Sequence, residues 1–400
     1  MEPMESLLSP RKEEYLAVGL MSGTSADGVD AALVRFIIQG SNIQDQLLEY
    51  MNIPYPRPLR EKVFKLFRDE AGSLNQVCQL NFEIGAFFAR AAEKLIRMSG
   101  FPREAIRVIG SHGQTVYHLP PNQKNMGAYT PSTLQIGEAS FIAQQTGLPV
   151  ASDFRTADIA AGGEGAPLVP IADYYLLRHS SRTRIIQNIG GIANTTFLPA
   201  GGSLDDVIAF DSGLGNMILD AVVKSFSKGR EAMDRGGKRA MRGKPDIKWL
   251  EEIMRNPYFT RKPPKTTGRE LFGEQFTAEL LKEGARRKLK MEDILATAAM
   301  LTVESIVQGY EKFCFPRSMP QEVILGGGGA RNAFLVNALK QRLPESIRIV
   351  DHETLGINSQ AKEALAFALL GLLCILGHPG NVPSATGARK SVSLGKLYYP

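Results

Sequence analysis

Short runs of aliphatic and β-branched residues alternate with glycine clusters along most of this chain. Several clusters follow directly after such runs, which is how α/β proteins place backbone amides at the carboxyl ends of strands. In the first part of the chain, the pattern predicts strands over residues 15–22, 31–38, 46–53, 107–110, 133–136 and 149–154. Helices are predicted there over residues 60–70, 74–98 and 168–177.

The pattern then starts again. Strands are predicted over residues 185–188, 193–198 and 207–210, followed by a helix over 216–226. The remaining predicted elements are helices near 276–287 and 292–313, strand 323–325, helix 331–343, strand 347–350 and helix 360–375. Because the same order of elements, two strands joined by a turn, a third strand and a helix, begins both halves of the chain, we expect two related α/β lobes with a cleft between them. Two unrelated α/β domains are the alternative.

The chain length supports a division into two parts, since 400 residues exceed what one ordinary core organises. We assign residues 1–150, with a C-terminal helix at about 360–385, to an N-terminal lobe that carries a phosphate loop. Residues 151–359 are assigned to a C-terminal lobe. Hinges are expected near residues 150–185 and 355–365.

The net charge of +6 raises the question of a polyanionic partner. Residues 228–269 hold 13 basic and 5 acidic residues, a net of +8, so the rest of the chain has a net of −2. Nucleic-acid grooves interleave aromatic with basic residues, but only Trp249, Tyr258 and Phe259 are aromatic in this segment. We therefore expect no nucleic-acid partner, and interpret residues 228–242 as a solvated helix.

Three features indicate a cytoplasmic protein without a membrane partner. The three cysteines, Cys78, Cys314 and Cys374, are widely spaced and odd in number, which favours a reducing compartment. Residues 1–14 contain no apolar signal segment. The longest apolar run, residues 364–377, is 14 residues long, whereas a membrane-spanning helix needs about 20.

A glycine-rich hairpin is predicted at residues 19–30. Its glycines allow a tight turn whose N–H groups approach phosphate oxygens, and Asp27 supplies a carboxylate suited to Mg²⁺. It is neither a Walker A loop nor a dinucleotide-binding fingerprint, because no Gly-Lys-Ser/Thr follows and a strand comes next. A plain hairpin is the alternative. The candidate nucleotide-binding residues are Gly23, Thr24, Ser25, Ala26, Asp27, Gly28, Val29 and Asp30.

Two further glycine loops lie in the second half of the chain. The turn at residues 188–194 matches the first hairpin in position, and the four glycines at 326–329 lie between a strand and a helix. Such a loop lets the backbone pass close to a flat ligand, and the helix N-terminus favours an anionic group. A flexible loop is the alternative. The candidate nucleotide-binding residues here are Asn188, Gly190, Gly191, Gly327, Gly328 and Asn332.

Polar residues are predicted at the ends of other strands. Asp211 is placed just before a helix, where a catalytic base belongs in an α/β cleft, although an Asp there also serves as a helix N-cap. His112 lies in a second cluster, and a satisfied structural histidine is its alternative. Asp153, Arg155, Asp158 and the glycine-rich residues 162–165 form a polar loop of a kind that often binds sugars.

Eight motifs occur in an order that resembles one family. They are GLMSGTSADGVD, GSHGQTVYH, LQIGEAS, ASDFRTADIAAGGEGAPLVP, NIGGIANTT, FDSGLGN, PPKTTGRE and LGGGGARN. Together they resemble the anhydro-N-acetylmuramic acid kinase family, whose close relatives are the levoglucosan kinases, from about residue 16 to 398. The resemblance implies the two-lobed α/β fold of the acetate/sugar kinase, Hsp70 and actin superfamily, which consists of duplicated ribonuclease H-like domains.

The resemblance also implies roles for individual residues. ATP and Mg²⁺ would be required, with residues 23–30 as the phosphate loop and Asp27 and Glu363 as metal ligands. Asp211 would be the general base in a reaction that opens a 1,6-anhydro ring and phosphorylates the released O6. The substrate-binding residues would be His112, Gln135, Asp153, Arg155 and Glu363.

Some residues depart from the family pattern and affect the expected substrate. Thr156 and Ala157 replace basic residues that usually follow Asp-Phe-Arg, and Glu164 replaces a Gln. Because a guanidinium is the natural partner of the lactyl carboxylate of a muramic sugar, these changes favour a neutral anhydrosugar such as levoglucosan, although Arg155 remains. Lys265, Thr266 and Arg269 are interpreted as reaching the sugar or the nucleotide.

A broader alternative remains at the level of sequence. A non-catalytic, nucleotide-switched binding protein would share the same fold, but a pure switch does not need a base such as Asp211. A homodimer would not be unusual for the family.

Overall fold

The computed structural model describes residues 12–23, 25–67, 73–119 and 129–400. The chain divides into two compact units, Met1–Leu176 with Gln360–Pro400, and Leu177–Ser359. The boundary expected after residue 150 falls inside strand β6 (Val150–Ser152), which pairs with strands of the first unit, so residues 151–176 group with that unit here. Among the described residues, none of the helices is both long and apolar enough to cross a membrane.

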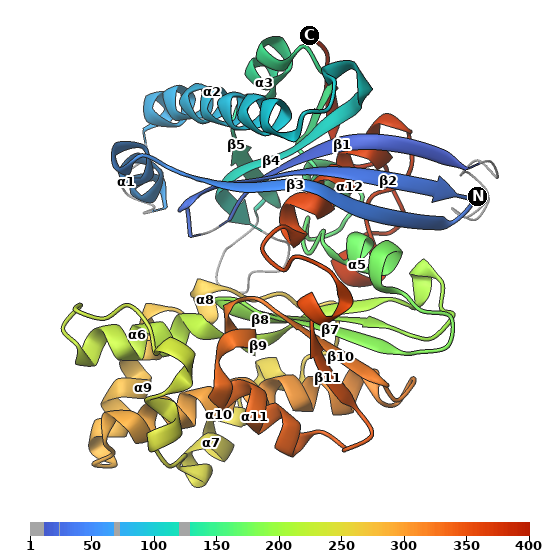
Figure 1. The fold of residues 1–400 in the computed structure, drawn as a ribbon. Coiled ribbons are helices and arrows are strands. Elements are labelled where there is room, and N and C mark those ends of the chain that lie inside the picture. The colour runs from blue at the N-terminus through green and yellow to red at the C-terminus, as the bar shows by residue number, and fades with distance from the viewer. Residues whose placement is uncertain (1–11, 24, 68–72, 120–128) are drawn as a thin grey trace. The chain divides into compact units, whose positions relative to one another are not determined.

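The first unit is built on a mixed sheet in the order β12-β6-β4-β1-β2-β3, with β5 added to β4 (Figure 1). β1, β2 and β3 are antiparallel neighbours, whereas β4 runs parallel to β1. Its strands are β1 (Glu13–Ser22), β2 (Gly28–Gln39), β3 (Asn42–Pro54), β4 (Ile106–Leu119), β5 (Ser132–Ile136), β6 and β12 (Lys396–Tyr398). Its helices are α1 (Arg57–Leu66), α2 (Leu74–Ser99), α3 (Ala139–Thr146), α4 (Thr156–Ala160), α5 (Pro170–Leu177), α12 (Lys362–Ile375) and α13 (Pro383–Thr386).

Successive side chains of β1 point to opposite faces of this sheet, and the two faces have different environments. Leu16, Val18 and Leu20 point into a core that also contains apolar residues of α2. Gly19 points to the opposite face, where a Cβ atom would lie 1.7 Å from the carbonyl oxygen of Ala364 in α12. Gly110 of β4 meets α12 in the same way, at 1.9 Å from the carbonyl oxygen of Phe367. The apolar helix α12 therefore packs directly on backbone, which only glycine permits.

The second unit repeats this arrangement with the sheet order β11-β10-β7-β8-β9. β7, β8 and β9 are antiparallel neighbours, and β10 and β11 follow in parallel on the other side of β7. The strands are β7 (Arg184–Ile189), β8 (Ile192–Leu198), β9 (Ile208–Leu214), β10 (Glu322–Gly326) and β11 (Arg348–Asp351). The helices are α6 (Asn216–Phe226), α7 (Ile247–Met254), α8 (Arg269–Phe272), α9 (Glu274–Arg286), α10 (Met291–Gly309) and α11 (Ala333–Arg342).

Both sheets thus open with three antiparallel strands and continue with parallel strands beside the first of them. This shared strand order is that of a duplicated ribonuclease H-like domain, so the predicted fold class is confirmed. In the second unit, the core collects beneath one face of the sheet around α10, most of whose residues are buried.

Within residues 228–269, which we call the basic segment, the structure differs from the helix predicted over residues 228–242. Residues 228–242 contain two short 3₁₀ turns rather than a helix. Gly236 and Gly237 have φ angles of 67° and 73°, which are unfavourable for other residues in a helix. The carboxylate of Asp234 accepts hydrogen bonds from the backbone N–H groups of Arg239 and Ala240, at 2.9 and 3.0 Å, and so stabilises the non-helical path.

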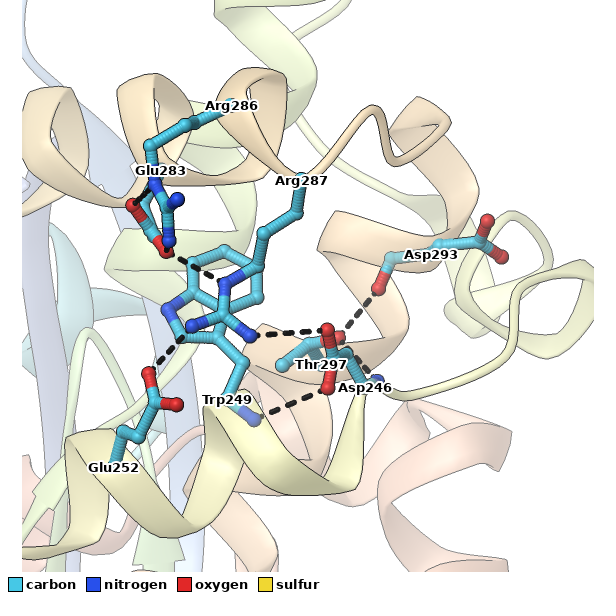
Figure 2. Close-up of polar contacts among 8 residues, drawn as sticks. All are labelled: Asp246, Trp249, Glu252, Glu283, Arg286, Arg287, Asp293 and Thr297. Atoms are coloured by element: carbon cyan, nitrogen blue, oxygen red, sulfur yellow. Dashed lines mark hydrogen bonds and ion pairs between the residues drawn. The ribbon is translucent and has the colours of Figure 1, made fainter.

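The part of the segment that follows is anchored by one arginine (Figure 2). Arg287 donates to Glu283 at 2.6 Å and to Glu252 of α7 at 2.5 Å, and it lies over the ring of Trp249. Asp246 caps α7 by accepting from the backbone N–H of Trp249 at 3.1 Å. These contacts attach α7 to α9, so the acidic residue Glu252 and the ring of Trp249 in this segment pair with an arginine outside it.

Candidate active site

The glycine-rich hairpin connects β1 to β2 in the first unit. The backbone N–H of Ala26 donates to the carbonyl of Gly23 at 3.1 Å and closes the turn, with Ala26 at a φ of 44°. Ser25 Oγ donates to Asp27 Oδ1 at 2.9 Å, and both side chains are exposed. Thr24, predicted to bind nucleotide, lies outside the described residues. The turn therefore presents hydroxyl and carboxylate groups on its exposed side.

The hairpin continues into β2, where neighbouring residues differ in environment. Val29 is fully buried, so only its backbone is available to a ligand. A Cβ at Gly28 would lie 2.3 Å from the carbonyl oxygen of Ile53, so this position requires glycine. Asp30 Oδ1 accepts from Tyr50 Oη at 2.6 Å and from Asn52 Nδ2 at 2.9 Å.

One glutamine supports the base of this hairpin. Ser22 Oγ donates to Gln114 Oε1 at 2.7 Å, and Gln114 Nε2 donates to the carbonyl oxygen of Gly23 at 3.1 Å. Gln114 is completely buried in β4, which lies beside β1 in the sheet. Sequence reasoning missed Gln114 and also Tyr50 and Asn52, because their partners are set by strand register rather than by neighbouring positions.

Glu363 lies in the first turn of α12. Partial desolvation by the surrounding protein raises its pKa, and the negative charges of Asp30 and Asp27 raise it further. Lys362 and Arg155 act in the opposite direction. Because the side chain of Glu363 is exposed, water screens part of this effect. The two predicted metal ligands, Asp27 and Glu363, are therefore near enough within the first unit for their charges to repel each other.

The carboxylates of Asp27 and Glu363 fit Mg²⁺. Among the described residues, no group of three or more His, Cys, Asp and Glu side chains is arranged to hold a metal ion. Mg²⁺ in phosphoryl-transfer sites is bound by one or two carboxylates together with substrate phosphates and water. Two carboxylates that repel each other match that type of site better than a closed protein cage.

His112, which is buried, pairs with Arg155, which is partly buried. Arg155 Nη2 and Nε lie 2.9 and 3.2 Å from His112 Nε2, and Nη1 donates to the carbonyl of Gly165 at 2.8 Å. His112 Nδ1 lies 3.0 Å from the carbonyl oxygen of Gly113. Burial lowers the pKa of His112 well below its ordinary value, and the Arg155 charge lowers it further. Burial also lowers the pKa of Arg155, to about 10.

These contacts determine which ring nitrogen of His112 carries the proton. An Arg that donates to Nε2 requires that nitrogen to be unprotonated, so the proton is on Nδ1 and points to Gly113. His112 is thus a neutral side chain that orients Arg155. Both the substrate-binding prediction and the structural alternative for His112 are compatible with this geometry.

Asp153 and Gln135 are held by other first-unit residues. Asp153 has a φ of 59°, and its carboxylate lies 2.7 Å from Lys396 Nζ of β12. Gln135 Nε2 donates to Thr133 Oγ1 at 2.7 Å and to Thr115 Oγ1 at 3.3 Å. Both side chains are partly exposed. Lys396, near the end of the chain, carried no sequence signal for this contact.

Asp211 belongs to the second unit. It lies within β9 opposite Asn194, and the strand continues three residues beyond it to Leu214. Helix α6 is preceded by Gly215 at its N-cap position, so the alternative role of Asp211 as N-cap is wrong. Asp211 Oδ2 accepts from the backbone N–H of Thr267 at 2.9 Å. The side chain is partly exposed, so water can reach the carboxylate.

The two glycine loops of the second unit lie next to each other. A Cβ at Gly327 would lie 2.7 Å from both Asn188 Oδ1 and the carbonyl oxygen of Ile189. Gly327 has a φ of 74°, and Gly191, Gly327 and Gly328 are exposed. The carbonyl of Gly190 accepts from the N–H of Asn216 at 2.8 Å, which joins this loop to the start of α6.

Asn332 has a different local role. Its Oδ1 accepts from the N–H groups of Phe334 and Leu335, at 3.1 and 3.3 Å, and so caps α11. The side chain is buried, and a Cβ at Gly237 would lie 2.1 Å from its Oδ1. Asn332 therefore fixes the glycine loop to the helix, and its place in nucleotide binding stays a prediction.

Lys265 is not at the surface, contrary to the hypothesis that it reaches the sugar or the nucleotide. Its exposed fraction is 1%, and its Nζ lies within 4.7–5.5 Å of three aromatic ring centroids. Thr266 is partly buried, and Arg269 begins α8.

The chain is similar to proteins of one family over nearly its full length. A family model described as anhydro-N-acetylmuramic acid kinase matches residues 15–400. The anhydro-N-acetylmuramic acid kinase of Caldanaerobacter subterraneus subsp. tengcongensis is 47% identical over 386 residues, covering 96% of this chain and 97% of that protein. The protein of the same name from Bacillus thuringiensis subsp. konkukian is 45% identical, covering 96% and 99%.

Solved structures show a weaker likeness. The ROK hexokinase from Thermus thermophilus matches with a TM-score of 0.38 and 15% identity, covering 90% of this chain and 99% of that chain. A PilM–PilN type IV pilus biogenesis complex matches with a TM-score of 0.40 and 14% identity, covering 89% and 98%. These values are too low to support an argument about function.

Proposed function

The chain belongs to the anhydro-N-acetylmuramic acid kinase family, and from this premise we propose that it is an ATP-dependent kinase of a 1,6-anhydrosugar. The main proposed substrate is 1,6-anhydro-N-acetylmuramic acid, which the enzyme converts to N-acetylmuramic acid 6-phosphate. The observation that carries the proposal is the family match together with the position of Asp211, whose carboxylate is partly exposed and oriented by Thr267.

Asp211 is the proposed general base. It accepts a proton from water as the water oxygen forms a bond to the anomeric carbon, C1. The bond between C1 and the bridging O6 then breaks, and O6 forms a bond to the γ-phosphorus of ATP while the bond to ADP breaks. A positioned base contributes about 10²–10⁴-fold to such a reaction. The N–H of Thr267 keeps the carboxylate in one orientation throughout.

The hairpin of residues 23–30 is the proposed phosphate loop. Its backbone and the hydroxyl of Ser25 are available to phosphate oxygens, and Gln114 keeps the base of the turn fixed. Asp27 and Glu363 would hold Mg²⁺, which when bound supplies positive charge to the transferring phosphoryl group. The mutual repulsion that raises the pKa of Glu363 would be relieved by such a cation.

In the second unit, the loops at Asn188, Gly190, Gly191, Gly327 and Gly328 are proposed to bind the remainder of ATP. The exposed glycines allow a flat group to approach the backbone. Asn332 would contribute through the loop that it anchors to α11 rather than through its capped side chain.

On the sugar side, His112, Gln135, Asp153 and Arg155 are the proposed substrate-binding residues. Arg155 supplies a positive charge suited to a lactyl carboxylate, and its guanidinium is held by His112 and Gly165.

Levoglucosan is the second candidate substrate, and a specific observation favours it. Thr156 donates its hydroxyl to the backbone carbonyl of Asp153 at 3.1 Å, and Ala157 has no polar side-chain atom. Neither can supply a positive charge to a lactyl carboxylate. The neutral sugar would be converted to glucose 6-phosphate by the same chemistry.

The decisive measurement is ADP release by the purified protein with ATP and Mg²⁺. Three sugars are compared: 1,6-anhydro-N-acetylmuramic acid, levoglucosan and glucose. We expect turnover with at least one anhydrosugar, highest kcat/KM with the muramic sugar, and little with glucose. Higher kcat/KM with levoglucosan would establish the second candidate, and ADP release with neither anhydrosugar would refute the proposal.

A further inference from the structure

Lys265 has an unusual environment for a charged side chain. Its ammonium lies 4.7 Å from the ring centroid of Tyr258, 5.4 Å from that of Phe313 and 5.5 Å from that of Phe210. Its Nζ donates a hydrogen bond to the carbonyl oxygen of Tyr258 at 3.3 Å. Burying an ammonium is costly unless such contacts compensate. The ammonium of Lys265 is therefore held by contacts inside the protein rather than by water.

The segment that Lys265 anchors contacts Asp211 at three points. The N–H of Asp211 donates to the carbonyl of Lys265 at 3.0 Å. Tyr258 Oη donates to the carbonyl oxygen of Asp211 at 2.8 Å. The N–H of Thr267 donates to the carboxylate of Asp211 at 2.9 Å. Residues 258–267 thus form hydrogen bonds with the N–H, the carbonyl oxygen and the carboxylate of Asp211, and so fix the position of the proposed base.

The lysine side chain links the two ends of this segment. Its backbone is bonded to Asp211, while its ammonium is bonded to Tyr258 and lies over the ring of Phe210, the residue before Asp211. Without these contacts, residues 258–267 would lose their attachment to the end of β9. A displacement of about 1 Å in a catalytic group can cost about 10²-fold in rate.

We propose that Lys265 is the positioning residue of Asp211, and that its ammonium, enclosed by Phe210, Tyr258 and Phe313, holds the carboxylate in its productive orientation. The proposal rests on the proposed function of Asp211 as the base. It assigns the lysine of the PPKTTGRE motif a role within the second unit, without contact to either substrate.

The charge of Lys265 adds a measurable pH dependence. Burial lowers the pKa of Lys265 to about 8. Asp211 opposes this shift, whereas Arg261 and Lys312 increase it. The ammonium is therefore lost as the pH rises through about 8, and we expect kcat to fall there. Because the folded protein releases this proton at a lower pH than the unfolded chain does, raising the pH through about 8 increases the free energy of unfolding, so the fall in kcat should occur without a loss of folded protein.

The test uses the full-length protein and four variants: Lys265→Met, Lys265→Arg, Asp211→Asn and the double variant of Lys265→Met with Asp211→Asn. Lys262→Met is the matched control, because Lys262 is an exposed lysine of the same segment. ADP release gives kcat and both KM values, and circular dichroism gives the folded fraction.

Lys265→Met is expected to lower kcat by about 10–100-fold while the KM for ATP changes by less than about threefold. Lys265→Arg should recover part of the activity and keep it above pH 8, because a guanidinium stays charged. In the Asp211→Asn background, Lys265→Met should add little further loss, as expected for two residues acting as one unit.

Unchanged kcat in Lys265→Met would overturn the proposal, as would an equal loss in both backgrounds. If Lys265→Met does not fold, a Lys265→Arg profile that still declines at pH 8 overturns it. If the wild-type protein shows no anhydrosugar kinase activity, the proposed function fails, and amide hydrogen exchange then tests the positioning separately. Faster exchange at Asp211 and Thr267 in Lys265→Met supports the proposal, and unchanged exchange contradicts it.

Discussion

His112 illustrates how burial and one neighbouring charge determine the state of a titratable group. Its ring is enclosed by protein and packs at a tilt of 40° against the ring of Phe367, and Arg155 donates to its Nε2. Both effects lower its pKa, so the folded protein keeps the ring neutral at pH values where the unfolded chain binds a proton. The imidazole is therefore better suited to orient Arg155 than to act as an acid.

Replacing His112 should change how stability depends on pH. Because the folded pKa lies below the unfolded value of about 6.5, the free energy of unfolding should fall as the pH decreases below that value. One such group contributes up to about 1.4 kcal/mol per pH unit. We expect His112→Gln to show a shallower decline between pH 6.5 and 5, measured by urea unfolding.

The other histidines with lowered pKa values, among them His118 at about 4, remain in the variant. The difference between the two proteins therefore isolates His112. Equal slopes in the two proteins would contradict a neutral, buried His112.

Asp211→Asn tests the proposed base directly. The amide keeps the size of the side chain but cannot accept a proton from water, so we expect kcat to fall by about 10²–10⁴-fold. Nucleotide affinity, measured by calorimetry, should stay within about threefold of the wild type. Asp205→Asn is the control, since Asp205 is an exposed carboxylate of the same unit. More than a tenth of the wild-type kcat in Asp211→Asn would remove the assignment.

At the residue scale, the sequence identified the chemical groups better than their surroundings. Asp211 is identified by the motif FDSGLGN. The alternative role of Asp211 as a helix N-cap is excluded only by the structure, in which β9 continues past Asp211 to Leu214. From the sequence, Lys265 is expected either to be exposed in a basic stretch or to reach a ligand, whereas the structure buries it. Its aromatic neighbours are separated in sequence by up to 103 residues, from Phe210 to Phe313, and become a site only through folding.

Among the elements, α12 depends on glycines in the strands below it. Gly19 and Gly110 let the helix approach the backbone of β1 and β4, and Gly371 of α12 meets Gly110 in return. This close packing also sets the position of Glu363, one residue before Ala364. The strand glycines were taken from sequence as turn signals, which is one reason β4 was predicted to end at residue 110 although it runs to Leu119.

We expect Gly19→Ala to destabilise the protein. A Cβ at this position would lie 1.7 Å from the carbonyl oxygen of Ala364, so α12 must move. Overpacking of this kind costs about 1–3 kcal/mol or more, which urea unfolding would detect. Gly23→Ala is the control for stability, because nothing lies within 4 Å of a Cβ there. Equal stability of Gly19→Ala and wild type would show that α12 is not packed as described.

The carboxylate of Asp158 makes several of the contacts that hold residues 158–165 in place. Asp158 is fully buried and accepts hydrogen bonds from Gly165 N, Asn381 Nδ2 and Thr386 Oγ1, at 2.8, 2.8 and 2.7 Å. It therefore joins α4 to the C-terminal segment that contains α13. The sequence suggested sugar binding for this loop, but the contacts of Asp158 give it a structural role that no local pattern indicated.

Asp158→Ala should lower the free energy of unfolding by about 3–5 kcal/mol, because three buried donors lose their partner. The urea midpoint is the appropriate measurement, with Asp205→Ala as the exposed control. A loss below about 1 kcal/mol would indicate that water replaces the carboxylate.

At the scale of the whole molecule, the two units differ in how the chain builds them. The second unit is a continuous segment, Leu177–Ser359, and the buried residues of its core all lie between Ile185 and Ile347. The first unit is discontinuous, because α12 returns to the sheet formed by the first part of the chain. The repeated pattern of strands made this duplication predictable, whereas the return of β12 to the first unit had no comparable signal.

This difference predicts how fragments of the chain behave. Residues 177–359 should fold alone, since they contain their own sheet and core. Residues 1–176 should not, because they lack α12, which buries 11 residues, from Ala364 to Cys374. Burying one large apolar side chain stabilises by about 1.5–3 kcal/mol, so removing several of them exceeds a typical stability of about 5–15 kcal/mol.

Circular dichroism and urea unfolding of three fragments would decide the matter. A cooperative transition is expected for residues 177–359 and for residues 1–176 fused through a flexible linker to 360–400, but not for residues 1–176 alone. A cooperative transition in the unfused fragment would mean that the sheet and α2 suffice as a core. Absence of one in residues 177–359 would mean that the second unit depends on the first, despite its self-contained core.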